Sequence, residues 1–368
     1  MKTIRRMLYS ELLSAIGFVT LGFLVLFSFF DLVDELRLLG RGVGGSYQLP
    51  DALLYVALLI PTHLYDLLPI TVLIGSIYVM ARLAKSSEFT ILRTSGLGPW
   101  RVLDTLLSFG LMFALLTLAV GDYVSPVSER GAQLLKARFT GDITVGLTGA
   151  WLKEQRADHS WAVNVSQLSA NGQMRGVRLF EFDERGFLVS RITAERGRFG
   201  PGESWTLDNV RRDRFLTRDP ATARVEHAVE PTLRWDTSLS AEMVAATLLR
   251  PDRMSTFSLF EYIGHLKTNS QTAQVYEIEF WRRIFYPVSC LVMVVLALPF
   301  AYLHFRTSGI TGYVFGGVLA GISFVILNNL FGYIGNLNNW LPWVAAGVPG
   351  AIYMVLSLAA FGWLVLRR

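Results

Sequence analysis

The chain has 368 residues, of which 52% are hydrophobic and only 17% are charged. Soluble domains carry about 25% charged residues, so this composition and a mean hydropathy of +0.40 argue against an ordinary soluble protein. The single cysteine, Cys290, excludes an intrachain disulfide and a metal site built from cysteines, and we expect it to be a small packing residue.

The first apolar segment, residues 12–30, contains no charged residue and follows Lys2, Arg5 and Arg6. A membrane-spanning helix needs about 20 apolar residues. Because the run is long and no small-residue cleavage site closes it, the sequence favours a retained helix over a removed signal peptide.

Five further spans follow along the chain. Three are separate apolar runs, at 52–81, 105–121 and 284–303. Residues 307–366 contain no Asp, Glu, Lys or Arg, and as one helix they would extend for about 90 Å, which is too long for a single span. The Asn-rich segment 336–339 divides them in two. The sequence therefore predicts six transmembrane helices, arranged as three before and three after a more polar segment.

The distribution of Lys and Arg in the short connections predicts the orientation. With a cytoplasmic N-terminus, ten such residues fall on the cytoplasmic side and two, Arg37 and Arg41, on the outer side. The ten are Lys2, Arg5, Arg6, Arg82, Lys85, Arg93, Arg101, Arg306, Arg367 and Arg368. We expect both termini in the cytoplasm and the central segment outside it.

The central segment, residues 136–240, has the pattern of a β domain. Residues 161–165 and 186–189 are typical of short strands, and Asn171-Gly172, 183–186 and 200–202 are turn signals. This spacing predicts an all-β domain. After it, residues 256–267 form an amphipathic helical pattern, with an apolar side that we assign to Phe257, Phe260, Ile263, Gly264 and Leu266.

The sequence lacks common motifs of nucleotide-binding and metal-dependent enzymes. The sequence has no G-x-x-x-x-G-K-[ST] phosphate loop and no H-E-x-x-H, and its five histidines are far apart. We therefore expect a protein that is not an enzyme and binds no cofactor or metal. The alternative is a membrane-anchored enzyme acting on lipid or cell-wall intermediates, with the β domain as its catalytic part.

The connection at residues 84–98, between the second and third spans, has the pattern of a short amphipathic helix. Ser86 or Ser87 can cap it, Glu88 favours its first turn, and Gly96 ends it. Such a helix either docks into a cytoplasmic partner or lies on the membrane surface.

Residues 87–97, Ser-Glu-Phe-Thr-Ile-Leu-Arg-Thr-Ser-Gly-Leu, resemble the coupling-helix signature of the LptF/LptG permease family. This family forms the membrane part of the ABC exporter that extracts lipopolysaccharide from the inner membrane of Gram-negative bacteria. The layout of three spans, a domain and three spans is similar over the whole chain. Residues 250–255, 262–266 and 340–343 resemble the LptG branch more than the LptF branch.

The resemblance implies a fold, a set of partners and a coupling site. It implies spans within residues 1–130 and 250–368 and a periplasmic jelly roll at 136–240. It implies an LptB ATPase dimer that holds ATP and Mg²⁺, a paralogous LptF permease, LptC and lipopolysaccharide as partners. The residues implied to contact the ATPase are Glu88, Phe89, Ile91, Leu92, Arg93 and Gly96.

The resemblance also implies that the first and fifth spans, 12–30 and about 309–333, border the gates through which lipid enters. The residues implied to contact lipopolysaccharide are Phe27, Phe30, Asp31, Arg37, Arg41, Arg282, Arg283 and Phe315. Some family members have a lysine where this chain has Asp31, so Asp31, Asp34 and Glu35 either bind phosphates through divalent cations or pair with Arg37.

Three alternatives remain open from the sequence. Arg282 and Arg283 either meet lipid phosphates or form intramolecular ion pairs and interface anchors. His63 and Asp66, near the outer end of the second span, are expected to be structural or to line a cavity. A lipoprotein-release type of ABC permease is a further possible class, but it typically has four spans rather than six.

Overall fold

The computed structural model describes residues 2–40, 47–86, 98–140, 143–144, 150–155, 159–168, 173–200, 204–216, 224–237, 239, 243–244, 251–302 and 310–366. These form two compact units. Unit 1 comprises Met1–Asp34, Val56–Glu129 and Gln274–Arg368, and unit 2 comprises Glu35–Tyr55 and Arg130–Ala273. The predicted turns at Asn171-Gly172 and at Pro201-Gly202 lie outside the described residues.

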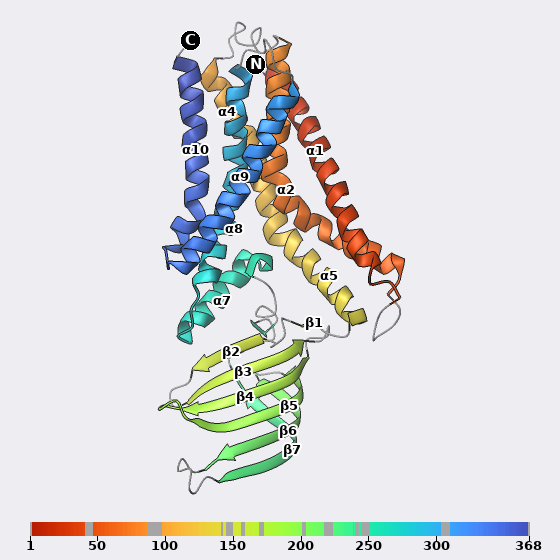
Figure 1. Ribbon diagram of the computed structural model, residues 1–368, viewed down its shortest axis with the longest axis vertical. Helices are drawn as coiled ribbons and strands as arrows, with labels where there is room; N and C mark the ends of the chain where they lie inside the picture. The colour runs from red at the N-terminus through yellow and green to blue at the C-terminus, as the bar shows by residue number, and fades with distance from the viewer. Residues whose placement is uncertain are drawn as a thin grey trace. The chain divides into compact units, whose positions relative to one another are not determined.

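Six helical segments of the described chain are long and apolar enough to cross a membrane, which confirms the predicted number. They contain α1 (Lys2–Leu36), α2 (Leu49–Lys85), α4 (Pro99–Ala119) with α5 (Ser125–Thr140), α8 (Gln274–Ala297), α9 (Ile310–Leu337) and α10 (Pro342–Leu366). Each helix is longer than its apolar run because the backbone hydrogen bonds continue into more polar sequence. The ends of the chain at α1 and α10 lie at the same end of unit 1 (Figure 1).

The third span contains a π-helical turn, Val120–Val124, between α4 and α5. Such a turn inserts one extra residue into the helix and widens it locally. At Gly121 a Cβ atom would overlap the ring of Tyr65 on α2. Glycine is therefore the residue that allows this segment to lie directly against α2.

The core of unit 1 is built from the inward faces of α1, α2, α4 and α8. Ile77, Met80, Leu106 and Met293 are among its fully buried side chains. Close approach fixes α1 on α2, since a Cβ at Gly75 would overlap Ile16. Dispersion contacts of this kind stabilise helix pairs in lipid, where burial from water contributes little.

Unit 2 contains a single antiparallel sheet of seven strands. The strands are β1 (Ile143–Thr144), β2 (Ala150–Gln155), β3 (His159–Leu168), β4 (Met174–Asp183), β5 (Leu188–Gly200), β6 (Ser204–Phe215) and β7 (Val225–Asp236). From β3 to β7 each strand pairs with the next strand in sequence, and β1 and β2 both pair with β3 (Figure 1).

The predicted all-β domain is thus confirmed, and its described strands form a meander. A jelly roll would instead need long connections that carry the chain between two sheets. The β4–β5 connection, which the structure describes in full, is a hairpin at Asp183, whose Oδ1 accepts from the backbone N–H of Phe187 at 2.9 Å. Gly186 in this predicted turn has φ +78°, a conformation that glycine adopts without strain.

One face of the sheet carries the apolar core of unit 2. Val163, Val177, Ile192 and Leu207 are buried there at alternate strand positions. Trp205 is fully buried beside them, and its indole N–H donates to the carbonyl of Leu239 at 2.8 Å. That bond satisfies the one polar atom of the largest core side chain.

The predicted amphipathic helix is α7 (Thr256–Thr268), and its amino terminus is capped by the hydroxyl of Ser255, which accepts from the N–H of Ser258. Its buried side is formed by Leu259, Tyr262, Ile263 and Leu266. The assignment of Phe257 and Phe260 to that side was wrong, since their exposed fractions are 75% and 66%. The spacing of 259, 262, 263 and 266 gives the more regular stripe.

Candidate functional site

The predicted site residues on α1 lie next to a titratable group of α2. The carboxylate of Asp31 and Nε2 of His63 are 2.5 Å apart, and both side chains are partly exposed. The ring of Phe27 lies 5.5 Å from the His63 ring. Asp31 therefore pairs with a histidine that lies thirty-two residues further along the chain, a partner that the sequence analysis did not identify.

The two gate-forming spans implied by the resemblance are the least buried of the six. In the apolar windows of α1 and α9 only 17% of residues are buried, against 78% in α2. Phe30 on α1 and Phe315 on α9 have exposed fractions of 56% and 62%. Apolar surface of this extent on a spanning helix faces lipid or another spanning helix.

Arg283 is engaged inside the helical bundle. Its exposed fraction is 7%, and Nη1 donates to the carbonyl of Gly121 at 2.9 Å, within the π-helical turn. The guanidinium also lies over the ring of Tyr65 at 5.7 Å and 3.9 Å from the carboxylate of Asp122. These contacts favour the intramolecular alternative for Arg283 over a contact with substrate.

Arg282 is also tied to neighbouring helices, but it is less buried. Nη2 donates to the backbone carbonyl of Asn328 on α9 at 2.8 Å, and Nη1 lies 3.3 Å from the carboxylate of Glu279. The sequence placed both arginines at the end of a helix that starts at Ile284. They lie instead within α8, which begins at Gln274, and this position lets Arg283 reach the π-helical turn and Arg282 reach α9.

A second charged cluster lies in unit 2; the sequence analysis named its Glu35 but not the partners that the structure gives it. Glu35 is 4% exposed, accepts from the hydroxyl of Tyr47 at 2.9 Å, and pairs with the ammonium of Lys136 at 2.7 Å. The same ammonium lies 4.8 Å from the ring centroid of Tyr55. The partners are up to 101 residues apart in sequence, so no local pattern signals the cluster.

The remaining predicted residues have different positions. Arg37 is exposed just beyond the end of α1. Arg41 and the six coupling residues Glu88, Phe89, Ile91, Leu92, Arg93 and Gly96 lie outside the described residues. The described residues next to the coupling segment are helical: α2 runs to Lys85, and α4 begins at Pro99 after Gly98.

The titratable groups described above are arranged in pairs rather than in a metal site. Among the residues that the structure describes, no three His, Cys, Asp or Glu side chains come together as metal ligands. What these groups do is join helices: Asp31 and His63 join α1 to α2, and Arg282 joins α8 to α9.

Comparison with known proteins identifies the family. The sequence profile of the lipopolysaccharide export system permeases LptF/LptG matches residues 6–366. The lipopolysaccharide export system permease protein LptG of Escherichia coli K12 is 28% identical over 339 residues, which are 91% of this chain and 90% of that protein. The protein of the same name from Haemophilus influenzae is 26% identical over 370 residues, covering 100% of this chain and 99% of that protein. The chain belongs to the LptF/LptG family of lipopolysaccharide export system permeases.

Proposed function

We propose that this chain is a transmembrane subunit of an ABC transporter that extracts lipopolysaccharide from the inner membrane and passes it to a periplasmic bridge. The observation that carries the proposal is the match of the family profile across the whole chain, together with six spans interrupted by one β domain. The relatives in Escherichia coli and Haemophilus influenzae carry the name of the same export system.

In this proposal the chain itself is not catalytic and holds no cofactor. A separate LptB ATPase dimer binds ATP and Mg²⁺ and docks on the segment that contains Glu88. A paralogous LptF chain completes the permease, and LptC receives lipopolysaccharide. The absence of a phosphate loop from the sequence supports the proposal that ATP is bound by a separate chain.

The proposed orientation has both termini and the coupling segment in the cytoplasm and the β domain in the periplasm. The excess of Lys and Arg on one side of the spans supports it. The position of both chain ends at one end of unit 1 agrees with an even number of spans (Figure 1).

The exposed faces of α1 and α9 are the proposed entry surface for lipid. Phe27, Phe30 and Phe315 would contact acyl chains, while Arg37 and Arg41 would meet the phosphates, since guanidinium groups bind phosphate through paired hydrogen bonds. Asp31 then acts mainly through His63, because the two side chains are already in contact.

Native mass spectrometry of the tagged chain, gently purified from its own membrane, tests the assembly. The proposal expects two copies of an ATPase, one paralogous six-span chain and bound lipopolysaccharide. A chain that leaves the membrane alone or as a homo-oligomer would instead favour an enzyme or an independent membrane role.

A substitution in the coupling segment tests the transmission of ATP-driven motion. Glu88→Ala should lower copurification of the ATPase and lipopolysaccharide export by at least about tenfold if a desolvated charge contact of roughly 1.4 kcal/mol or more is lost. Glu184→Ala is the matched control, since Glu184 lies exposed in the β4–β5 turn. Unchanged export and assembly with Glu88→Ala would contradict the coupling role.

A further inference from the structure

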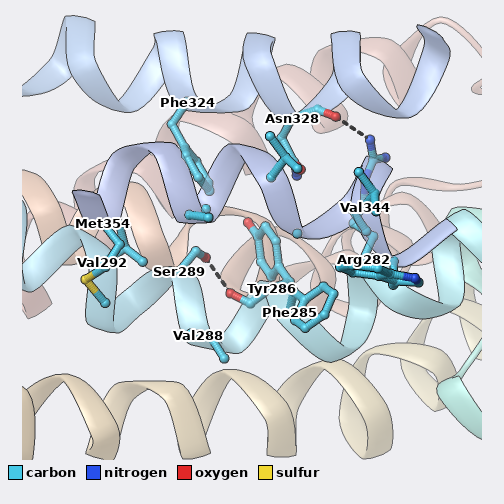
Figure 2. A pocket seen from close by; sticks show the side chains of 16 residues that line it. Arg282, Phe285, Tyr286, Val288, Ser289, Val292, Phe324, Asn328, Val344 and Met354 are labelled. Atoms are coloured by element: carbon cyan, nitrogen blue, oxygen red, sulfur yellow. Dashed lines mark hydrogen bonds between the residues drawn. The ribbon is translucent and has the colours of Figure 1, made fainter. Parts of the chain in front are cut away.

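A groove of about 420 Å³ lies between α8, α9 and α10 in unit 1. All three helices belong to apolar spans. Its lining is largely aliphatic and aromatic, and includes Phe285, Val292 and Met354 (Figure 2). Trp343 also lines it. Of the described residues that the resemblance implies to contact lipopolysaccharide, Arg282 alone lines this groove.

The charge in the groove is confined to one end. Arg282 is the one charged side chain among the described lining residues, and it lies at the opposite end from Val292 and Met354 in Figure 2. Its bonds to the carbonyl of Asn328 and to Glu279 use two of five N–H donors. Its Nε is buried and has no partner within the described chain, but 22% of the side chain is exposed, so the rest of the guanidinium can still meet an anion.

The length of the groove matches one leaflet of a membrane. From Arg282 to Val292 the helix rises about 15 Å, at 1.5 Å per residue. The hydrocarbon core of a bilayer is about 30 Å thick, so half of it is also about 15 Å. The charged end of the groove therefore lies at headgroup depth when its apolar end lies near the bilayer centre.

The volume of the groove favours a single acyl chain over a protein helix as its occupant. A protein helix of the same length, with a diameter of at least 10 Å including side chains, would occupy roughly 1,200 Å³. That is well above the 420 Å³ present.

We propose that this groove is a binding site for an anionic phospholipid, with one acyl chain along α8 and α10 and the phosphate at Arg282. The charge at one end and the apolar lining of the remainder give the groove the polarity of such a lipid. The phosphate would share the guanidinium with Glu279, whose oxygen lies 3.3 Å from Nη1. Phe27, Phe30 and Phe315, which were proposed on α1 and α9 to contact lipopolysaccharide, do not line this groove.

Two glycines of α10 offer a matched pair of variants. A Cβ at Gly350 would meet no atom within 4 Å, and Gly350 lines the groove, so Gly350→Leu fills it without a backbone clash. Gly362 lies on the same helix, also has open space around its Cβ, and is not part of the groove. Gly362→Leu therefore makes the same change of residue outside the site.

The experiment uses the full chain with its copurifying subunits, stripped of lipid in detergent and titrated with dioleoyl phosphatidylglycerol under native mass spectrometry. We expect one tightly held lipid in the wild type and after Gly362→Leu. Gly350→Leu should weaken it at least tenfold. Equal binding by the wild type and Gly350→Leu would overturn the proposal.

Two further measurements test whether the lipid phosphate lies at Arg282 and whether the groove holds a phospholipid rather than another molecule. Arg282→Gln should weaken phosphatidylglycerol severalfold and leave dioleoyl glycerol, which has no phosphate, unaffected. A photoreactive amino acid in place of the exposed groove residue Ala351 should cross-link to phospholipid. Cross-linking to a protein, or to lipopolysaccharide in preference to added phospholipid, would contradict the assignment.

Discussion

Individual side chains of this protein join helices that the sequence alone does not bring together. The sequence identified His63, Asp31, Arg282 and Arg283 as unusual, because ionisable groups are costly inside a membrane. It did not identify their partners, since those lie on other helices and depend on how the helices pack. The Asp31–His63 pair and the bond from Arg283 to Gly121 are known only from the structure.

The Asp31–His63 pair should couple α1 to α2 energetically. We expect Asp31→Asn and His63→Gln each to destabilise unit 1, and the double variant to lose less than the sum of the two. A coupling free energy of about 1 kcal/mol is expected for a partly exposed pair. Thermal unfolding in detergent of the four variants of the cycle measures it, and strict additivity would show that the contact contributes nothing.

Arg283 should contribute more to stability than an exposed arginine. Arg283→Met removes the charged donor and leaves the Gly121 carbonyl unpaired in a buried position, so we expect a loss of about 3 kcal/mol. Arg185→Met in the exposed β4–β5 turn should change stability by less than about 0.5 kcal/mol. Chemical unfolding of both variants provides the comparison, and equal effects would contradict the structural role of Arg283.

At the scale of elements, the sequence predicted which helices and strands exist better than it predicted where they end or which of their faces are buried. Six spans, an all-β segment and the α7 helix follow from apolar length, strand spacing and the amphipathic pattern of residues 256–267. The π-helical turn was not predicted, although Pro126 just after it lacks the N–H that an α-helix would give to the carbonyl of Asp122. It is maintained by contacts at Gly121 from Tyr65 and Arg283, which belong to other helices.

The π-helical turn makes Gly121 intolerant of a side chain. Gly121→Ala should destabilise unit 1 by about 1–3 kcal/mol, because the added methyl group overlaps the Tyr65 ring. Gly22→Ala on α1, where a Cβ meets no atom within 4 Å, should be neutral or slightly stabilising. Melting temperatures of the two variants test this, and a neutral Gly121→Ala would show that α2 can move away freely.

Within the β domain, the hydrogen bond from the indole N–H of Trp205 should contribute measurably to the stability of the core. Trp205→Phe removes the bond to the Leu239 carbonyl and leaves a small cavity, so we expect a loss of about 2–3 kcal/mol. Trp151→Phe, at a half-exposed position, should have little effect. Hydrogen exchange of the β4–β6 amides in the full chain, read by mass spectrometry, separates the two cases.

At the scale of the whole molecule, the stability of unit 2 should depend on pH through His265. Burial lowers the pKa of His265 below its ordinary value of 6.5. The unfolded chain therefore binds a proton that the folded chain resists, and stability falls as the pH drops below about 6.5. Replacement by Asn should remove that part of the pH dependence.

The matched control for this pH effect is His159, whose side chain is 45% exposed. His159→Gln should leave the slope of stability against pH between about 7.5 and 5.5 unchanged, because this side chain is largely exposed and the control removes a histidine outside the buried α7 site. Unfolding of the full chain, followed by hydrogen exchange in the α7 segment, measures both variants. A wild-type slope that persists after removal of His265 would contradict this assignment.

The two units also differ in how local their contacts are along the chain. The sheet pairs each of β3 to β7 with its neighbour in sequence, whereas unit 1 is assembled from three stretches separated by the residues of unit 2. Local pairings form early, and distant ones wait for the intervening chain. During synthesis the meander can therefore close once β7 has been made, while α4 still lacks its partner α8 and Asp122 still lacks the guanidinium of Arg283. The first three helices consequently form the part of the nascent protein that most needs protection by the insertion machinery.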